Sequence, residues 1–297
     1  MSAGRPARLA VGVVSAGRVG SVLGAALTAA GHHVVATSGV SRNSVHRAET
    51  LLPGVALLPP DEVVQRADLA LLAVPDDVLP GLVRGLASAG CFRPGQIVVH
   101  TSGAHGVSVL DGAVEHGVLP LALHPVMTFT GRPEDVERLA SCCVGVTAAA
   151  DDEAAWSVGE ALVLEMGAEP VRIAEAVRPL YHAALAHGAN HLVTLVRDCA
   201  EILERAGISP AERLIAPLLS AALDNALRHG DRALTGPVAR GDSGTVRTHL
   251  REFAAVDAEL AETYRVLAGR TARRAGAAGL LPGNAVDEVR ATLEEQR

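Results

Sequence analysis

Residues 9–24, with the sequence LAVGVVSAGRVGSVLG, constrain the fold of this chain more than any other stretch. The apolar run at 9–14 has the composition of a buried strand, and an Ala- and Leu-rich helical pattern follows to Ala30. Gly31 ends this pattern, and a second apolar run begins at His33. The order of strand, tight turn, helix and strand predicts an α/β protein with a doubly wound, mostly parallel sheet of the dinucleotide-binding type.

The turn in this unit carries the first candidate cofactor-binding residues. They are Ser15, Ala16, Gly17, Arg18, Val19 and Gly20. Because the first N–H groups of a helix lack partners and carry partial positive charge, they attract a pyrophosphate. Gly17 and Gly20 occupy the second and third glycine positions of a G-x-G-x-x-G motif, but Ser15 occupies the first, where glycine normally permits the tight turn. The alternative interpretation is an ordinary βα turn that binds nothing.

A second group of candidate cofactor-binding residues follows the second strand, at Ser41, Arg42 and Asn43. NAD-selective sites place an acidic residue near this position to hold the ribose 2′-hydroxyl, and no acid occurs between His33 and Arg47. A guanidinium suits a 2′-phosphate instead. We therefore expect NADP(H) as the cofactor. A helix N-cap in this segment is the alternative, and it leaves Arg42 unexplained.

The overall composition predicts a globular protein of two domains. Of the 297 residues, 49% are hydrophobic and 20% are charged, so the chain has enough apolar side chains for two cores. Its net charge of −7 does not favour a nucleic acid or an anionic membrane as a partner. No apolar run reaches the ~18 residues that a bilayer requires. Arg18 interrupts the first run, which argues against a signal peptide.

The cysteine and lysine content limits the chemistry. None of the four cysteines has the spacing of a zinc ligand. They are Cys91, Cys142, Cys143 and Cys199. We therefore expect reduced, buried thiols in a cytoplasmic protein, and no bound metal. All 26 basic residues are arginine, which excludes a mechanism that needs a lysine amine.

Further strands are expected at 97–101 and 119–123, and both end on polar residues. Ser102 and Gly103 follow the first of these strands, and His124 follows the second. Since the carboxyl ends of parallel strands meet at one edge of a sheet, we expect these residues to line a substrate pocket. The alternative interpretation makes Ser102 a turn residue and His124 a structural histidine beside a proline.

From about residue 175 the sequence loses strand-like alternation and becomes helical. Long helices are expected at 179–206, 210–229 and 245–268, and a shorter one after Asn284. We therefore place a dinucleotide-binding domain at 1–173 and an all-helical domain at 174–297.

The first long helix places His182, Ala186 and Asn190 on one face, because they follow one another at intervals of four. A polar stripe among Ala and Leu side chains makes His182 and Asn190 candidate catalytic residues, and a helix–helix hydrogen bond is the alternative. His187 and His191 also have a spacing that a metal accepts, but no third ligand lies at a supporting distance.

The loop at 235–242 is rich in Gly, Pro, Arg and Asp. In a functional interpretation, Arg240 presents its fork-shaped guanidinium to a substrate carboxylate. In the structural alternative, the loop joins two helices and Arg240 pairs with Asp242.

Several of these segments together resemble a known family. They are AGRVG at 16–20, SRN at 41–43, AVPD at 73–76, HTSGA at 100–104, HP at 124–125, YHAA at 181–184 and LTGPVARGD at 234–242. Over nearly its whole length, the chain is similar to candidate NADP-dependent oxidoreductases with an N-terminal Rossmann-like domain and a helical C-terminal domain of unknown function. Their architecture resembles that of 6-phosphogluconate dehydrogenases, β-hydroxyacid dehydrogenases and pyrroline-5-carboxylate reductases.

The resemblance implies a homodimer whose helical domains meet, and it implies roles for single residues. β-Hydroxyacid dehydrogenases of this architecture use a Lys-x-x-x-Asn pair on the first long helix. Asn190 matches the Asn, but Ala186 stands in the place of the Lys, so His182, one turn earlier, becomes the candidate proton donor. Ser102 and Gly103 resemble the Ser-Gly pair that holds the substrate in those enzymes.

We therefore expect an NADPH-dependent reductase of a small carbonyl acid. Ketopantoate is favoured only because one relative in the family is an alternative ketopantoate reductase of pantothenate biosynthesis. The nicotinamide is expected along the strand ends at Val74, Pro75 and Ser102. His182 would protonate the developing alkoxide, with Asn190 and Ser102 orienting the substrate.

Two alternatives to this function are considered. One is a reductase that acts on an imine or a deazaflavin. The other is a non-catalytic NADP(H)-binding sensor or scaffold, which Ser15 and the absence of lysine favour.

Overall fold

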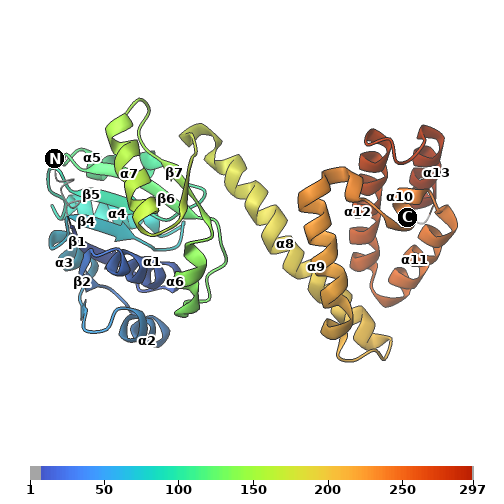
Figure 1. The fold of residues 1–297 in the computed structure, drawn as a ribbon, viewed down its shortest axis with the longest axis horizontal. Coiled ribbons are helices and arrows are strands. Elements are labelled where there is room, and N and C mark those ends of the chain that lie inside the picture. The colour runs from blue at the N-terminus through green and yellow to red at the C-terminus, as the bar shows by residue number, and fades with distance from the viewer. Residues whose placement is uncertain (1–7, 296–297) are drawn as a thin grey trace, which may run out of the picture. The chain divides into compact units, whose positions relative to one another are not determined.

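Strand β1, Ala10–Val14, lies inside the sheet. It is the first strand of the strand–turn–helix–strand segment that the sequence predicts. The structure is a computed structural model that describes residues 8–295 (Figure 1). Within this range the chain divides into two compact units between Gly188 and Ala189. The domain boundary predicted after residue 173 lies earlier, where the last strand has just ended.

The first unit, as far as it is described, contains one eight-stranded sheet with the order β3-β2-β1-β4-β5-β6-β7-β8. Besides β1, its strands are His33–Thr37 (β2), Ala56–Leu57 (β3), Leu69–Leu72 (β4), Ile97–His100 (β5), Leu119–Pro125 (β6), Cys143–Thr147 (β7) and Glu169–Arg172 (β8). Strands β1 to β6 pair in parallel, in the order of dinucleotide-binding sheets. Strand β7 is antiparallel to β6 and parallel to β8. The predicted fold class is confirmed.

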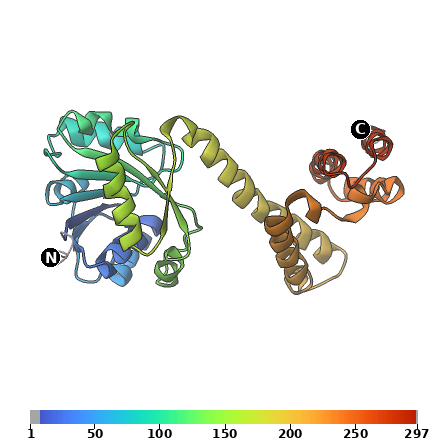
Figure 2. The ribbon, with the colours of Figure 1, turned by 45° about the horizontal axis from the view of Figure 1, so that its top comes forward.

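Helices cover both faces of this sheet, as Figure 2 shows. They are Arg18–Ala29 (α1), Arg42–Leu51 (α2), Pro60–Gln65 (α3), Leu79–Ser88 (α4), Asp111–Val114 (α5), Glu134–Leu139 (α6) and Glu153–Glu165 (α7). In β4, Leu69 and Leu71 pack in the core with α1 and α7, whereas Ala70 and Leu72 pack with α3 and α4. Burial on both faces explains why this strand is apolar without alternation.

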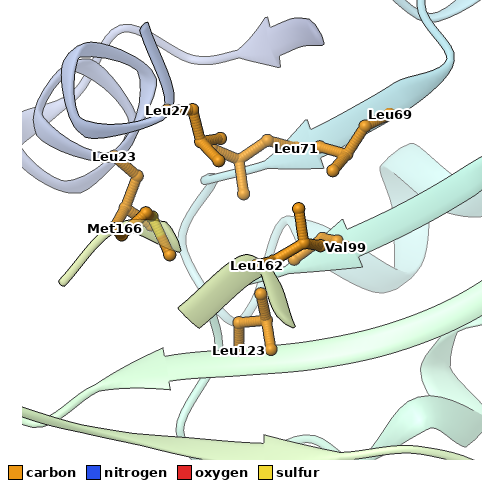
Figure 3. Close-up of a pocket in the computed structure, with 8 residues that line it drawn as sticks. All are labelled: Leu23, Leu27, Leu69, Leu71, Val99, Leu123, Leu162 and Met166. Atoms are coloured by element: carbon orange, nitrogen blue, oxygen red, sulfur yellow. The ribbon is translucent and has the colours of Figure 1, made fainter. Parts of the chain in front are cut away.

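The core between α1, α7 and the sheet contains a small apolar gap, which Figure 3 shows. It is lined by Leu23, Leu27, Leu69, Leu71, Val99, Leu123, Leu162 and Met166. Its volume is about 10 Å³, which is at the lower limit of the about 10–15 Å³ that one water molecule needs. We therefore interpret it as a packing defect and not as a ligand site.

Helix α8, Arg178–Arg205, crosses the division between the two units. It is followed by Ala211–His229 (α9), Gly236–Arg240 (α10), Ser243–Val256 (α11), Ala258–Ala277 (α12) and Gly283–Glu294 (α13). Val246 and Leu250 of α11 pack against Ala268 and Ala272 of α12 and Val289 of α13. The predicted helical character of the second half is confirmed.

The single helix predicted at 245–268 is wrong, because the structure divides this segment at Asp257. The Asp257 carboxylate accepts hydrogen bonds from the N–H groups of Glu259 and Leu260, over 2.7 and 3.4 Å. It therefore caps a new helix, α12, where the pattern predicts continuation. The Ala- and Leu-rich periodicity runs across the break and conceals it.

All four cysteines lie within the described residues and are free thiols. Cys91 is buried, and Cys142 and Cys199 are half-buried. Cys143 is exposed, so the expectation of a buried thiol is wrong at this position, which is the first residue of β7. Among the described helices, none is long and apolar enough to cross a bilayer.

Candidate active site

Ser38, at the end of β2, holds the turn that follows β1. The N–H of Ser15 donates a hydrogen bond to Ser38 Oγ over 2.8 Å, and the N–H of Ala16 donates to the Ser38 carbonyl oxygen over 2.6 Å. Ser15 has a φ of 78°, in the left-handed region that favours glycine. The turn therefore keeps its tight geometry, with a serine in a strained conformation.

Gly20 and Gly17 have different roles in this turn. A Cβ atom at Gly20 would lie 2.1 Å from the Ser15 carbonyl oxygen and 2.9 Å from Ala73 Cβ, so close packing requires glycine there. A Cβ atom at Gly17 would have Ser15 Oγ, at 3.4 Å, as its nearest neighbour. Gly17 is the N-cap of α1, and this helix has no capping side chain and no acid in its first turn. Its first N–H groups are therefore suited to an anion.

Ser41 caps helix α2, as the structural alternative for this segment predicts. Its Oγ accepts a hydrogen bond from the N–H of Ser44 over 3.1 Å. Arg42 and Asn43 follow it in the first turn, and both are exposed. Among the described residues Arg42 has no ion-pair partner, so its guanidinium is available at the start of α2, in the segment that follows β2.

His100, fully buried at the end of β5, shapes the loop that follows. Its Nδ1 accepts from the N–H of Ser102 over 3.2 Å, and its Nε2 donates to the Gly106 carbonyl oxygen over 3.0 Å. Burial lowers the pKa of His100 to about 3, so the ring is neutral. Ser102 Oγ in turn accepts from the N–H of His105 over 3.0 Å. These bonds fix the loop that carries Gly103.

Two imidazole rings converge on Gly103. A Cβ atom there would lie 2.8 Å from His124 Nε2, on β6, and 2.5 Å from His182 Cδ2, on α8. The two rings meet edge to face, with centroids 5.9 Å apart. Within the described chain the His182 ring has no hydrogen-bond partner. The structure thus brings together Ser102, Gly103, His124 and His182, as the sequence predicts.

The residues expected beside a nicotinamide lie at the same edge of the sheet. Strand β4 pairs with β5, and Val74 and Pro75 follow β4. Val74 is half-buried and Pro75 is exposed. His105 Nε2 donates to the Asp76 carbonyl oxygen over 3.2 Å, which joins the loops after the two strands.

Tyr181 is a site residue to which the sequence analysis assigns no role. Its hydroxyl lies 2.8 Å from Nδ1 of His124, and the two rings are perpendicular, with centroids 5.6 Å apart. Burial, together with the positive charge of Arg178, lowers the pKa of His124 to about 4. Burial also raises the pKa of the Tyr181 phenol. At neutral pH the pair therefore consists of a neutral imidazole and a neutral phenol.

Arg178 is a second site residue for which the sequence predicts no role. It is a fully buried cation at the start of α8. It donates to Thr147 Oγ1 over 2.8 Å and to the Ser102 carbonyl oxygen over 2.6 Å. Among the described residues it has no ion-pair partner, and its Nε makes no hydrogen bond. Burial lowers its pKa, since a charge without a counterion is unfavourable in the interior. Arg178 joins α8, which carries His182, to the loop before Gly103.

Asn190 and Arg240 belong to the second compact unit. Asn190 is exposed on α8, and Arg240 is exposed as the last residue of α10. The Asp242 carboxylate caps α11 through the N–H and Oγ1 of Thr245, over 3.0 and 2.7 Å. Among the described residues it forms no ion pair with Arg240. The hydrogen bonds from Thr245 and, to a smaller extent, the positive charge of Arg240 lower the pKa of Asp242. Within the described chain no group of side chains has the arrangement of a metal site.

Comparisons with known proteins match two family models to this chain, and the second model begins within the first compact unit. Residues 1–125 match the model of a Rossmann-like domain, and residues 142–271 match the model of a domain of unknown function, DUF2520. A search among curated proteins finds no match for the sequence.

Several solved structures share the fold over most of the chain. A candidate NADP oxidoreductase from Bacteroides fragilis is 20% identical, with a TM-score of 0.75 over 89% of this chain and 98% of its own. An imine reductase from Streptomyces aurantiacus is 15% identical, with a TM-score of 0.61 over 96% and 98%. A pyrroline carboxylate reductase from Plasmodium falciparum, with NADP bound, is 10% identical, with a TM-score of 0.55 over 96% and 98%.

Proposed function

We propose that this chain, in which a Rossmann-like domain precedes a DUF2520 domain, is an NADP(H)-dependent oxidoreductase that reduces a C=O or C=N bond of a small molecule. The convergence of His124 and His182 on Gly103, at the carboxyl edge of a sheet with the dinucleotide-binding order, carries the proposal. Open α/β sheets bind their ligands at this edge. Two imidazoles there supply a proton donor and a hydrogen-bond donor.

The cofactor proposal depends on the start of α1 and of α2. The uncapped N-terminus of α1 and the open side of Gly17 fit a pyrophosphate. The turn residues that hold it are Ser15, Ala16, Gly17, Arg18, Val19 and Gly20. Ser41, Arg42 and Asn43 hold the ribose 2′-phosphate, and Val74, Pro75 and Ser102 contact the nicotinamide. When bound, the reduced nicotinamide supplies a hydride.

In the proposed reaction, His182 donates a proton to the oxygen or nitrogen of the reduced group. Its ring is half-buried and makes no hydrogen bond within the described chain, so it is available to a substrate. His124, Ser102 and Gly103 hold the substrate. The roles of Asn190, which orients the substrate, and Arg240, which binds its carboxylate, stay predictions.

The substrate is proposed to be a small carbonyl acid, with ketopantoate as the first compound to test. The alternative of a C=N substrate is supported by the imine reductase and the pyrroline carboxylate reductase among the structural neighbours. A non-catalytic NADP(H)-binding sensor is the remaining candidate, and the strained Ser15 favours it through weaker cofactor binding.

Binding and turnover together test the proposal. We expect NADPH to bind more tightly than NADH, and NADPH absorbance to fall with ketopantoate, another keto acid or a cyclic imine. Arg42→Ala should weaken NADPH binding and leave NADH binding unchanged, whereas Arg84→Ala, an exposed arginine on α4, should affect neither. Binding without oxidation by any compound identifies the sensor, and failure to bind either dinucleotide overturns the proposal.

The proton donor is tested separately. His182→Ala should lower kcat by well over tenfold with the Kd for NADPH unchanged, because the proton is needed only in the chemical step. His229→Ala, an exposed histidine at the end of α9, is the control. An unchanged rate in His182→Ala removes this residue from the mechanism.

A homodimer through the helical domain is proposed as well. Leu214 and Leu218 on α9 are 55% and 67% exposed, and Leu227 is 79% exposed. Apolar side chains at these positions fit contact with a second copy. Light scattering after gel filtration tests this, and a monomer at micromolar concentration contradicts it.

A further inference from the structure

The hydroxyl of Tyr181 is placed by the backbone of β7. A Cβ atom at Gly145 would lie 2.7 Å from the Tyr181 hydroxyl oxygen and 3.2 Å from Ile173 Cγ1. The phenol therefore occupies space that exists only because residue 145 is glycine. This packing directs the hydroxyl to Nδ1 of His124, at 2.8 Å.

The hydrogen bond between these two residues fixes which ring nitrogen of His124 carries the proton. A neutral imidazole has one donor nitrogen and one acceptor nitrogen. Among the described residues the Tyr181 hydroxyl has no hydrogen-bond partner other than His124. A neutral phenol is a better donor than acceptor, because the oxygen lone pair is delocalised into the ring, so donation of its proton to Nδ1 is the favoured arrangement. The proton of His124 then lies on Nε2, the atom that faces Gly103.

Charged and titratable groups around the pair favour the neutral ring. Arg178 lies with its guanidinium carbon 5.9 Å from the centre of the Tyr181 ring. Burial disfavours a second proton on His124 most strongly, Arg178 and His182 act in the same direction, and Asp76 acts in the opposite direction. Burial raises the pKa of the Tyr181 phenol, Arg178 opposes this rise, and Cys143, on β7, adds to it.

We infer that Tyr181 is a positioning residue, which holds His124 as the Nε2–H tautomer and so keeps a neutral hydrogen-bond donor at Gly103 for the oxygen or nitrogen of the substrate. This inference rests on the proposed function for its catalytic meaning. The tautomer itself is a property of the protein without any ligand. A donor fixed before the reaction stabilises developing negative charge without reorganisation.

The chain provides a matched control in its only other tyrosine. Tyr264 pairs with His249 in the second unit, with its hydroxyl 3.0 Å from Nδ1 and the ring centroids 5.7 Å apart. Tyr264→Phe thus removes the same kind of hydrogen bond elsewhere in the chain. It should leave His124 and turnover unchanged.

The test is nitrogen NMR of the histidine rings at pH 7, with the His124 signals assigned through His124→Gln. The wild-type protein should show a protonated Nε2 and an unprotonated Nδ1 at His124. Tyr181→Phe should populate the other tautomer and raise the His124 pKa, because a hydrogen bond to the neutral ring is lost. A protonated Nδ1 in the wild type, or an unchanged tautomer in Tyr181→Phe, overturns the inference.

Turnover provides the second readout. Tyr181→Phe should lower kcat by about three- to tenfold, the factor that one hydrogen bond of ordinary strength supplies, with the Kd for NADPH unchanged. Wild-type kcat in Tyr181→Phe overturns the positioning role. Absence of turnover in the wild type contradicts the proposed function instead, and the NMR result still decides the tautomer. If Tyr181→Phe does not fold, Gly145→Ala, which displaces the phenol and keeps its hydroxyl, replaces it.

Discussion

Ser15 illustrates how one residue can depart from a motif while the local structure keeps its form. Its φ of 78° is the conformation for which the motif normally uses glycine. The hydrogen bonds from the Ser15 and Ala16 N–H groups to Ser38 hold the backbone there. A left-handed conformation in a residue with a Cβ atom costs roughly 1–2 kcal/mol.

Ser15→Gly should therefore raise the free energy of unfolding by about 1 kcal/mol, since the strain exceeds the extra entropy of glycine in the unfolded chain. Ser157→Gly, at an exposed position inside α7, should instead lower it by about 0.5 kcal/mol. Urea denaturation of both variants measures the difference. Equal losses of stability would show that Ser15 is not strained.

The two glycines of the turn should separate folding from cofactor binding. Gly20→Ala should destabilise the protein by about 1–3 kcal/mol, because its Cβ would lie 2.1 Å from a carbonyl oxygen. Gly17→Ala should leave the melting temperature nearly unchanged, since its Cβ has no protein neighbour closer than 3.4 Å. Its NADPH affinity should nevertheless fall by more than tenfold. Full affinity in Gly17→Ala would show that no phosphate approaches this residue.

At the scale of elements, side chains decide where the helices of the second half begin. Asp257 accepts hydrogen bonds from two N–H groups and so starts α12 directly after α11. Asp242 does the same for α11. In both cases the carboxylate accepts hydrogen bonds from N–H groups that have no partner within the helix, and this N-cap fixes the residue at which the new helix begins.

Asp257→Ala should lower the free energy of unfolding by about 1 kcal/mol, the usual contribution of an N-cap side chain. Asp287→Ala, at an exposed position within α13, should change it by less than about 0.5 kcal/mol. Thermal and urea denaturation give both values. Equal effects would argue that the cap does not stabilise the break between α11 and α12.

For the whole molecule, the buried histidines couple stability to pH. His100 and His124 have an ordinary pKa of 6.5 that folding lowers to about 3 and about 4. Between these values and 6.5 the unfolded chain binds more protons than the folded one, so stability is lost as the pH falls through this window. Asp68 and Asp135, whose pKa values folding lowers from 3.8, add their own loss of stability as the pH falls below 3.8, at the acid end of this window.

The urea midpoint should therefore decrease from pH 7 to pH 4.5, and His124→Gln should reduce this dependence. His46→Gln, at an exposed position, is the control and should keep the wild-type dependence. The slope with pH is the quantity to compare, because His124→Gln can also shift the midpoint at pH 7. The same slope in His124→Gln and the wild type would mean that this ring is not buried as a neutral group.

The sequence by itself determined the alternation of strands and helices in the first unit, the β1–α1 turn and the helical character of the second half, because these depend on patterns among neighbouring residues. It also indicated that Ser102, Gly103 and His124 lie at one sheet edge, since strand ends meet there, whereas His182 was expected beside them only from the family resemblance. It did not indicate that Tyr181 bonds to His124 or that Arg178 is fully buried. Only the tertiary structure decided these contacts, because they join residues far apart in the chain through packing that no local pattern encodes.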